Sequence, residues 1–177
     1  MIRKATEADI PAVAAIYERI HDAEDAGRLT TGWMRGVYPT EATAREALAA
    51  GELFVLEDGD VIAAAARINR VQVPVYARVK WRYAAKDDQV MVLHTLTVDP
   101  PLAGRGYGRR FLEYYERYAL ENGCPVLRID TNERNAAARA MYAGHGYIES
   151  GVVPTVFNGI PGVNLVCMEK RLDWSGR

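Results

Sequence analysis

Apolar and polar positions along this chain follow two periods, one typical of helices and one typical of strands. The first helical pattern covers residues 7–23, where apolar side chains recur every three or four positions: Ile10, Val13, Tyr17 and Ile20. Thr6 and Asp9 match the signature of a capping box at the start of this helix. A second, alanine-rich helix is expected between Thr40 and Gly51.

Strand patterns occupy the middle of the chain. Residues 53–56 and 61–68 flank an Asp58-Gly59 turn and predict a β-hairpin, with the alanine run 63–66 inside its second strand. Residues 90–98 are apolar at odd and even positions alike, which is typical of a central strand covered on both faces.

The connection between these strands, residues 70–88, has no clear period and includes Pro74, Tyr76, Trp81 and Tyr83. A connection of this length inside a compact domain is often functional. An extended hairpin with its own small apolar cluster explains the pattern equally well, so both interpretations stay open.

The second half of the chain continues with alternating elements. They are a helix after Gly108, a strand at 126–131, a helix after Asn135 and two strands at 147–156 and 163–172. Together the elements predict one mixed α/β domain over residues 1–172, followed by a short tail at 173–177.

Composition removes several function classes. A formal net charge of −1 gives no general attraction to nucleic acid or to an anionic membrane. The longest apolar runs fall short of the roughly 18 residues of a membrane span, and the N-terminal residues lack a signal-peptide pattern. Cys124 and Cys167 have no metal-ligand spacing, and a disulfide between them is not expected. A cytoplasmic location is the expectation.

A glycine-rich turn separates the strand at 90–98 from the helix that follows it. Gly104, Gly106 and Gly108 allow backbone amides to approach a ligand, and Arg105 and Arg109 add positive charge at a helix N-terminus. A tight turn with solvated arginines is the structural alternative. The pattern lacks the Gly-Lys-Ser/Thr of a P-loop, and the third glycine of a dinucleotide fingerprint would fall at Arg109.

Three segments together resemble the GCN5-related N-acetyltransferase (GNAT) superfamily. They are Leu-Thr-Val-Asp-Pro at 96–100, Gly-Arg-Gly-Tyr-Gly at 104–108, and the stretch from Asn135 through Tyr142 to Gly146-Tyr147. Ala103 departs from the superfamily's acyl-CoA signature, which usually has Gln or Arg at that position. Since that loop binds pyrophosphate largely through main-chain amides, the departure weakens the match without removing it.

The resemblance implies a mixed, mostly antiparallel central sheet flanked by helices. Its elements follow the order strand, two helices, three strands, helix, strand, helix and two strands. It implies acetyl-CoA as co-substrate, no metal, and transfer of the acetyl group to a primary amine of a small molecule by direct attack in a ternary complex. A sensor or interaction module that binds acyl-CoA without turnover is the alternative, and the presence of both His94 and Tyr142 favours the enzyme.

The resemblance also implies roles for individual residues. Tyr142 would protonate the departing thiolate, and Asn135 would bind the pantetheine amide, although a helix N-cap also explains an Asn at this position. His94 is the candidate base, since a pKa of about 6.5 suits proton removal and it is expected to share a strand face with Leu96 and Val98. A core histidine is the alternative. The expected acetyl-CoA-binding residues are Leu96, Thr97, Val98, Gly104, Arg105, Gly106, Tyr107, Gly108, Arg109, Asn135 and Tyr142.

The acceptor side is less defined. Trp33, Tyr38, Trp81 and Phe157 are candidates for lining the acceptor pocket, although core packing explains each of them as well. His21 and His145 are expected at the surface. The expected partner is a small-molecule amine, with no nucleic acid and no membrane, and a homodimer stays open.

Overall fold

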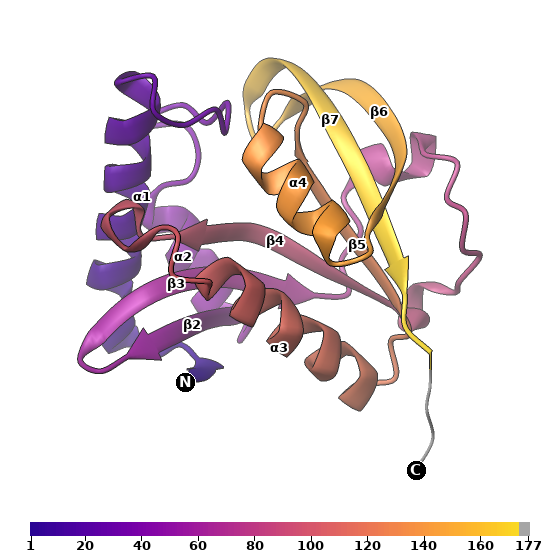
Figure 1. Cartoon of the computed structure of the whole chain (residues 1–177), viewed down its shortest axis with the longest axis horizontal. Helices are drawn as coiled ribbons and strands as arrows, with labels where there is room; N and C mark the ends of the chain where they lie inside the picture. Colours follow the sequence, from indigo (N-terminus) through magenta and orange to yellow (C-terminus); the bar gives the residue numbers. More distant parts are fainter. Residues whose placement is uncertain (174–177) are drawn as a thin grey trace.

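The computed structural model describes residues 1–173, which form a seven-stranded sheet with helices on both faces (Figure 1). The strand order is β1-β2-β3-β4-β5-β7-β6, and among the described strands β4 and β5 form the parallel pair while the other neighbours are antiparallel. The expected mixed, mostly antiparallel sheet is therefore confirmed. Residues 174–177 of the expected tail lie outside the described residues.

The elements follow the expected order along the chain. The strands are β1 (Ile2–Lys4), β2 (Leu53–Asp58), β3 (Val61–Asn69), β4 (Val90–Val98), β5 (Val126–Asn132), β6 (Ile148–Phe157) and β7 (Ile160–Arg171). The helices are α1 (Ile10–Asp25), α2 (Glu41–Ala49), α3 (Tyr107–Glu121) and α4 (Ala136–Gly144). The last turn is shorter than expected, because Asn158 and Gly159 with positive φ reverse the chain and β7 begins at Ile160.

Each face of the sheet has its own apolar layer. Helices α1 and α2 pack on one face of β2 and β3, where Ile10, Val13, Ala44 and Val55 are buried. On the other face, α3 and α4 cover a larger core. The alanine run 63–66 lies in β3 and is fully buried, because small side chains let helices approach a central strand closely.

The connection 70–88 contains two short 3-10 helices, η2 (Pro74–Arg78) and η3 (Asp87–Gln89), so the hairpin alternative is wrong. The segment does contribute an apolar cluster of its own, which covers one face of β5 and β7. Its middle is anchored by the buried carboxylate of Glu169, which accepts hydrogen bonds from the Arg82 amide at 2.5 Å and the Tyr83 amide at 3.2 Å.

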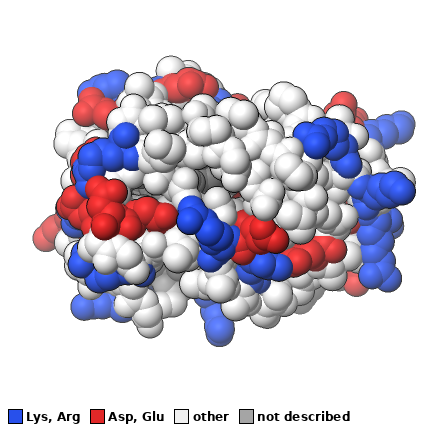
Figure 2. Space-filling model, turned by 90° about the horizontal axis from the view of Figure 1, so that it is seen from above, with Lys and Arg blue, Asp and Glu red and all other residues white. Residues whose placement is uncertain are grey.

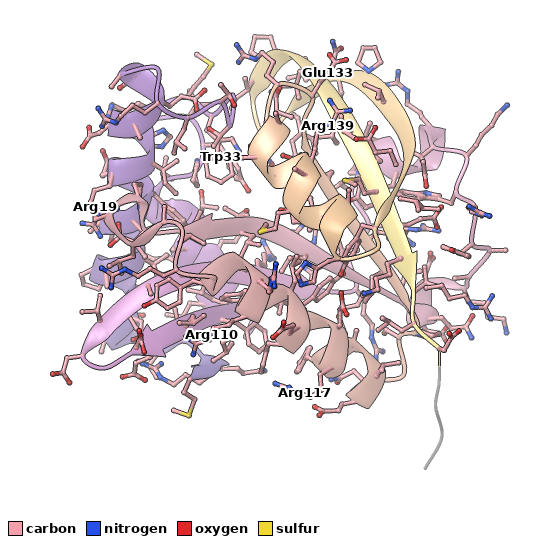
Figure 3. The ribbon with its side chains drawn as sticks, in the orientation of Figure 1. Arg19, Trp33, Arg110, Arg117, Glu133 and Arg139 are labelled. Atoms are coloured by element: carbon pink, nitrogen blue, oxygen red, sulfur yellow. The ribbon has the colours of Figure 1, made fainter. Side chains whose placement is uncertain are left out.

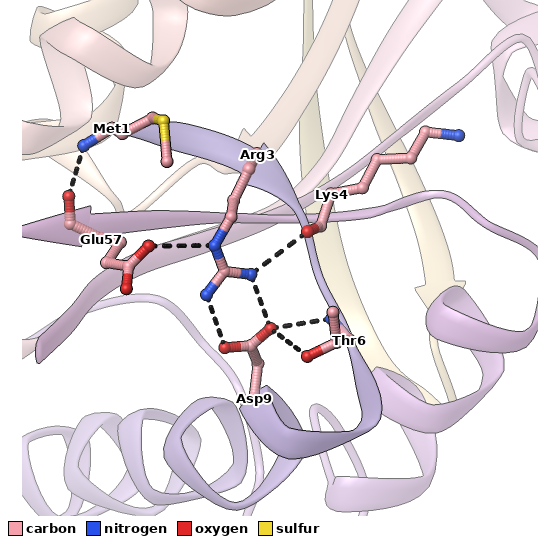
Figure 4. A network of polar contacts seen from close by, with 6 residues as sticks. All are labelled: Met1, Arg3, Lys4, Thr6, Asp9 and Glu57. Atoms are coloured by element: carbon pink, nitrogen blue, oxygen red, sulfur yellow. Dashed lines mark hydrogen bonds and ion pairs between the residues drawn. The ribbon is translucent and has the colours of Figure 1, made fainter. Parts of the chain in front are cut away.

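The start of the chain is fixed by a polar network, shown in Figure 4. The Arg3 guanidinium donates to both carboxylate oxygens of Asp9, at 2.8 and 3.0 Å, and its Nε donates to Glu57 at 3.0 Å. Asp9 also accepts from the Thr6 amide at 2.7 Å, which confirms the expected capping box. The Arg3 hydrogen bonds, opposed by burial, lower the pKa of Asp9 to about 2. This network joins β1 to the start of α1.

One of the two histidines expected at the surface, His21, is buried. His21 is 1% exposed, and its Nε2 lies 2.9 Å from the carbonyl oxygen of Pro39, so it holds the α1–α2 connection against α1. Sequence reasoning missed this contact because the loop that covers His21 carries no periodic signal. His145 is half-buried at the C-terminus of α4.

Candidate active site

The sheet opens where the paired strands β4 and β5 part. Their parallel register runs from Val90 opposite Val126 to Leu93 opposite Ile129. Beyond that point β4 continues against β3 and β5 continues against β7. A cavity of about 550 Å³ extends from this opening, and the face of the molecule in Figure 2 shows a hollow between uncharged residues near its centre.

An irregularity in β4 shapes the wall of the cavity. Thr95 has a φ of +53°, and the register against β3 shifts between the pairs Arg67–His94 and Ala65–Thr97. Two steps along β3 therefore correspond to three steps along β4, which is a β-bulge. The Tyr38 hydroxyl and the Thr95 hydroxyl are hydrogen bonded at this point, so the α1–α2 connection is tied to the bulge.

The bulge overturns one expectation about His94. Leu93, Leu96 and Val98 all pack toward the core beneath α3, whereas Val92 belongs to the cluster on the opposite face. Because one extra residue reverses the alternation, His94 does not share a face with Leu96 and Val98. A β-bulge leaves no reliable signal in a single sequence, so strand alternation alone predicts the wrong face for His94.

The glycine turn lies at the N-terminus of α3. Gly104 and Gly106 have φ values of +80° and +79°, and a Cβ on either residue would meet no atom within 4 Å. The amides of residues 104–109 donate no hydrogen bond to any residue in the described part of the chain. Open backbone N–H groups with the positive end of a helix dipole suit a pyrophosphate, and the exposed Arg105 and Arg109 add charge. This cradle fits acetyl-CoA.

Gly108 and Tyr107 have structural reasons of their own. A Cβ on Gly108 would lie 2.7 Å from the Met141 sulfur, so this glycine allows α3 and α4 to pack closely. The Tyr107 hydroxyl donates to Asp58 at 2.5 Å, which fastens α3 to the β2–β3 turn. Only the backbone of these two residues faces the cradle.

Asn135 caps helix α4 and also lines the cavity. Its side-chain oxygen accepts a hydrogen bond from the Ala138 amide at 3.2 Å. Thr97 is buried, and its hydroxyl donates to the Ala65 carbonyl at 3.1 Å. Thr97 therefore offers its backbone and not its hydroxyl to a ligand.

Tyr142 projects from α4 into the same cavity and is 5% exposed. Burial, with a smaller contribution from the negative charge of Asp130, raises the pKa of Tyr142 above its ordinary range. The phenol is therefore protonated at neutral pH, and it can act as a proton donor. Leu96, Val98 and Asn135 line the cavity together with Tyr142, so the structure brings these predicted residues to one place.

His94 is held by Asn69, whose side-chain oxygen lies 2.8 Å from His94 Nε2. The Asn69 amide group donates to the Glu52 carboxylate at 2.9 Å, so its oxygen must face His94 and the Val71 amide. His94 Nε2 therefore carries the proton and donates, and Nδ1 keeps the lone pair. Burial, followed by the charge of Arg67, lowers the pKa of His94 to about 4. The imidazole is neutral at pH 7.

The four aromatic candidates for the acceptor pocket do not all line the same cavity. Trp33 and Tyr38 contact each other edge to face, with centroids 5.9 Å apart, and both line the cavity together with Phe157. In Figure 3, Trp33 lies in the space between the α1–α2 connection and α4. Trp81 is not among the cavity residues, because its Nε1 donates to the Tyr76 carbonyl at 3.0 Å and its ring faces Arg128. Trp81 is core packing.

Sequence reasoning missed Asp130, which lines the cavity on β5 just beyond the point where β4 and β5 part. Its Oδ2 accepts a hydrogen bond from the Tyr76 hydroxyl at 2.6 Å. Burial raises the pKa of Asp130 to about 6, opposed by that hydrogen bond. The sequence feature that could have identified Asp130 is an acidic residue directly after the apolar run of a buried strand.

Two negative findings complete the site. Within residues 1–173, no group of three or more His, Cys, Asp or Glu side chains is placed to hold a metal ion. None of the helices in the described chain has both the length and the apolar character that a membrane crossing requires.

Solved structures share this architecture over nearly the whole chain. A GNAT-family acetyltransferase from Streptococcus agalactiae 2603 aligns with a TM-score of 0.79 and 22% identity, covering 98% of this chain and 95% of that one. YncA from Salmonella typhimurium, solved with its cofactor acetyl-CoA, aligns with a TM-score of 0.67 and 21% identity, covering 100% and 96%. At these identities the likeness shows the fold.

Sequence comparisons give the family. The uncharacterized N-acetyltransferase YhfO of Bacillus subtilis (strain 168) is 34% identical over 61 residues, which is 34% of this chain and 41% of that protein. The chain thus matches less than half the length of this curated relative. The model of the acetyltransferase (GNAT) family matches residues 15–147. Because that match spans most of the chain and includes the parted strands, the glycine turn and Tyr142, the protein belongs to the GNAT family.

Proposed function

We propose that this protein is an N-acetyltransferase that transfers the acetyl group of acetyl-CoA to a primary amine of a small molecule. The observation that carries the proposal is the combination of three features. The amides of residues 104–109 donate no hydrogen bond within the described residues, the end of β4 is parted from β5, and the adjoining cavity reaches Ala103 and contains Tyr142. Acetyl-CoA would supply an activated thioester when bound between the parted strands.

The protein's own residues have separable tasks in this proposal. The glycine turn holds the pyrophosphate, and the backbone of residues 96–98 holds the pantetheine arm and thioester, because β5 no longer occupies that edge of β4. Tyr142 is protonated at neutral pH and donates to the thiolate as it departs. The Leu96 amide is our candidate donor to the developing oxyanion.

In this proposal His94 orients the acceptor amine and is not the general base. With a pKa near 4, the imidazole is neutral at pH 7 and is too weak a base to hold a second proton. Its Nδ1 lone pair accepts a hydrogen bond from the acceptor amine or from a bridging water, while Asn69 fixes the ring. His94 thereby orients the nitrogen lone pair toward the thioester carbon.

The test is release of free thiol from acetyl-CoA across a panel of amines, polyamines, amino acids and peptides. Thiol release that depends on one class of amine, with the acetylated amine found by mass spectrometry, is the expected result. A rise in melting temperature with acetyl-CoA, but no thiol release with any amine, would instead identify an acyl-CoA-binding sensor of the same fold. No rise at millimolar acetyl-CoA would contradict both functions.

A further inference from the structure

The buried side chain of Asp99 lies at the start of the connection that leads from β4 to the glycine turn. Asp99 is 6% exposed, its amide donates to the Ala63 carbonyl at 2.9 Å, and its carbonyl accepts from the Leu102 amide at 2.8 Å. These two bonds fix its backbone, and the short 3-10 helix η4 (Pro100–Leu102) begins without a hydrogen bond from the Asp99 side chain. The carboxylate therefore has another reason to be there.

Arg19 of helix α1 is the partner of this carboxylate. Its Nε donates to Oδ1 at 2.6 Å and its Nη2 donates to Oδ2 at 2.9 Å, which is the bidentate geometry of strong arginine–carboxylate pairs. Among the described residues, Arg19 alone donates hydrogen bonds to these two oxygens. In Figure 3, Arg19 lies where α1 meets the connection from β4 to α3. One cation, 80 positions away in the chain, thus neutralises Asp99.

The pair lies close to the open amides of the glycine turn. Between Asp99 and Gly104 the chain consists of η4 and Ala103, which lines the cavity. At about 2.0 Å per residue in a 3-10 helix and about 3.3 Å per extended residue, the Cα atoms of Asp99 and Gly104 are at most about 13 Å apart. A unit charge about 10 Å from an anion changes its affinity about tenfold at an effective dielectric constant of about 20. An unpaired carboxylate at Asp99 would therefore repel a diphosphate.

We propose that Arg19 is a positioning residue for acetyl-CoA, which acts by neutralising Asp99. The charge beside the glycine turn is then set by Arg105 and Arg109, and it favours a diphosphate. This inference rests on the donor half of the proposed function. Arg19 does not contact the donor, because its guanidinium is occupied by Asp99. Helix α1 thereby contributes to a site whose recognisable motif lies wholly in the second half of the chain.

An ion pair that only fastens α1 to the connection predicts a different outcome. In that case removal of either partner would displace the glycine turn, and both variants would bind acetyl-CoA more weakly. Neutralisation predicts opposite effects for the two partners. Arg19→Gln leaves a buried anion near the diphosphate, whereas Asp99→Asn leaves a free cation there.

The test is isothermal titration of acetyl-CoA into the wild type and three variants. At about 10 mM salt, where screening is weak, Arg19→Gln should weaken binding about tenfold. Asp99→Asn should bind acetyl-CoA at least as tightly as the wild type. The double variant Arg19→Gln/Asp99→Asn should recover the wild-type affinity, because no buried charge is left without a partner. The loss in Arg19→Gln should shrink at about 300 mM salt.

Arg3→Gln is the matched control. Arg3 makes the same bidentate contact with the buried Asp9 at the N-terminus of α1 (Figure 4). Arg3→Gln and Arg19→Gln should both lower the melting temperature of the free protein, because each leaves a buried carboxylate unpaired. Only Arg19→Gln should change the affinity for acetyl-CoA.

Three results overturn the proposal: weaker binding in Asp99→Asn, no recovery in the double variant, or an unchanged affinity in Arg19→Gln. If Arg19→Gln is too unstable to titrate, Asp99→Asn and the double variant decide the question. A wild-type protein that does not bind acetyl-CoA contradicts the proposed function as well. Failure of the Arg19 proposal alone is recognised by a wild type that binds and by variants that do not follow the predicted signs.

Discussion

His94 Nε2 lies 2.8 Å from the side-chain oxygen of Asn69, and this contact decides which nitrogen of the imidazole is available in the cavity. Asn69 cannot turn its amide group toward His94 without facing the Glu52 carboxylate with its oxygen. The chain of contacts from Glu52 through Asn69 therefore fixes the tautomer, and burial keeps the ring neutral.

Asn69→Asp should raise the pKa of His94 by about one unit or more from its wild-type value near 4, because the new carboxylate accepts from Nε2 and favours the charged ring. NMR titration of the histidine ring protons in the variant and in the wild type measures this difference. A wild-type His94 that titrates near 6.5 would contradict the assigned burial and tautomer.

Stability should depend on pH through two opposed groups. Burial lowers the pKa of His94 from 6.5 to about 4, so between these values the unfolded chain binds more protons and stability rises with pH. Burial raises the pKa of Asp130 from 3.8 to about 6, so here the folded chain binds more protons and stability falls as pH rises. Each contribution is at most about 3 kcal/mol, and they oppose each other.

Single substitutions should show how His94 and Asp130 each change the dependence of folding stability on pH. Relative to wild type, Asp130→Asn should gain stability as pH rises from 4 to 6, and His94→Gln should lose it over the same interval. Urea denaturation at several pH values, followed by tryptophan fluorescence, measures both. Slopes of the same sign in the two variants would show that one of the two groups is not buried as described.

Tyr142→Phe should lower turnover by about 10²–10⁴-fold while acetyl-CoA binding is retained, because the phenol acts only when the thiolate departs. Tyr147→Phe is the matched control, since Tyr147 is buried with its ring 6.2 Å from that of Tyr142 but does not line the cavity. Single-turnover kinetics and calorimetry separate the two effects. Equal turnover in Tyr142→Phe and wild type would remove Tyr142 from the proton-donor role.

Gly106→Ala should weaken acetyl-CoA binding by at least tenfold, because the added methyl group occupies the open side of the amide cradle. Gly123→Ala is the control at the opposite end of α3, where φ is +73° and a Cβ also meets nothing within 4 Å. Both variants bear a similar backbone strain of about 1 kcal/mol. Isothermal titration with acetyl-CoA measures the difference, and equal losses of affinity would assign the effect to strain alone.

Trp33→Ala should raise the acceptor KM with little change in the free energy of unfolding, because Trp33 lines the cavity. Trp81→Ala should lose about 2–4 kcal/mol of stability and leave the acceptor KM unchanged, because Trp81 packs among Tyr76 and Arg128 away from the cavity. Steady-state kinetics measures the acceptor KM of each variant, and urea denaturation measures its free energy of unfolding. An increased acceptor KM in Trp81→Ala alone would reverse the two assignments.

Most of the helices and strands, and the candidate residues for acetyl-CoA binding, could be predicted from the sequence. Helical and strand periods depend on local alternation, and the glycine turn, Asn135 and Tyr142 have fixed spacings within short segments, so they can be recognised one segment at a time. The sheet itself was expected from the resemblance to the GNAT superfamily, because the order of elements alone predicted only one mixed α/β domain. Gly108 has a packing reason as well, since a Cβ there would lie 2.7 Å from the Met141 sulfur.

The surroundings of His94, Asp130 and the two tryptophans follow only from the folded chain. The bulge at Thr95 places His94 and Leu96 on opposite faces of β4. An extra residue in a strand can be recognised only from its pairing with the neighbouring strand. Asp130 acquires its raised pKa from burial, which is opposed by a hydrogen bond from Tyr76, a residue 54 positions away in the chain. Trp33 and Trp81 both lie in connections without a periodic pattern, and only the folded chain brings one to the cavity and the other to the apolar cluster beside Tyr76. Charge, burial and distance between remote residues are properties of the folded chain, and they determine this chemistry.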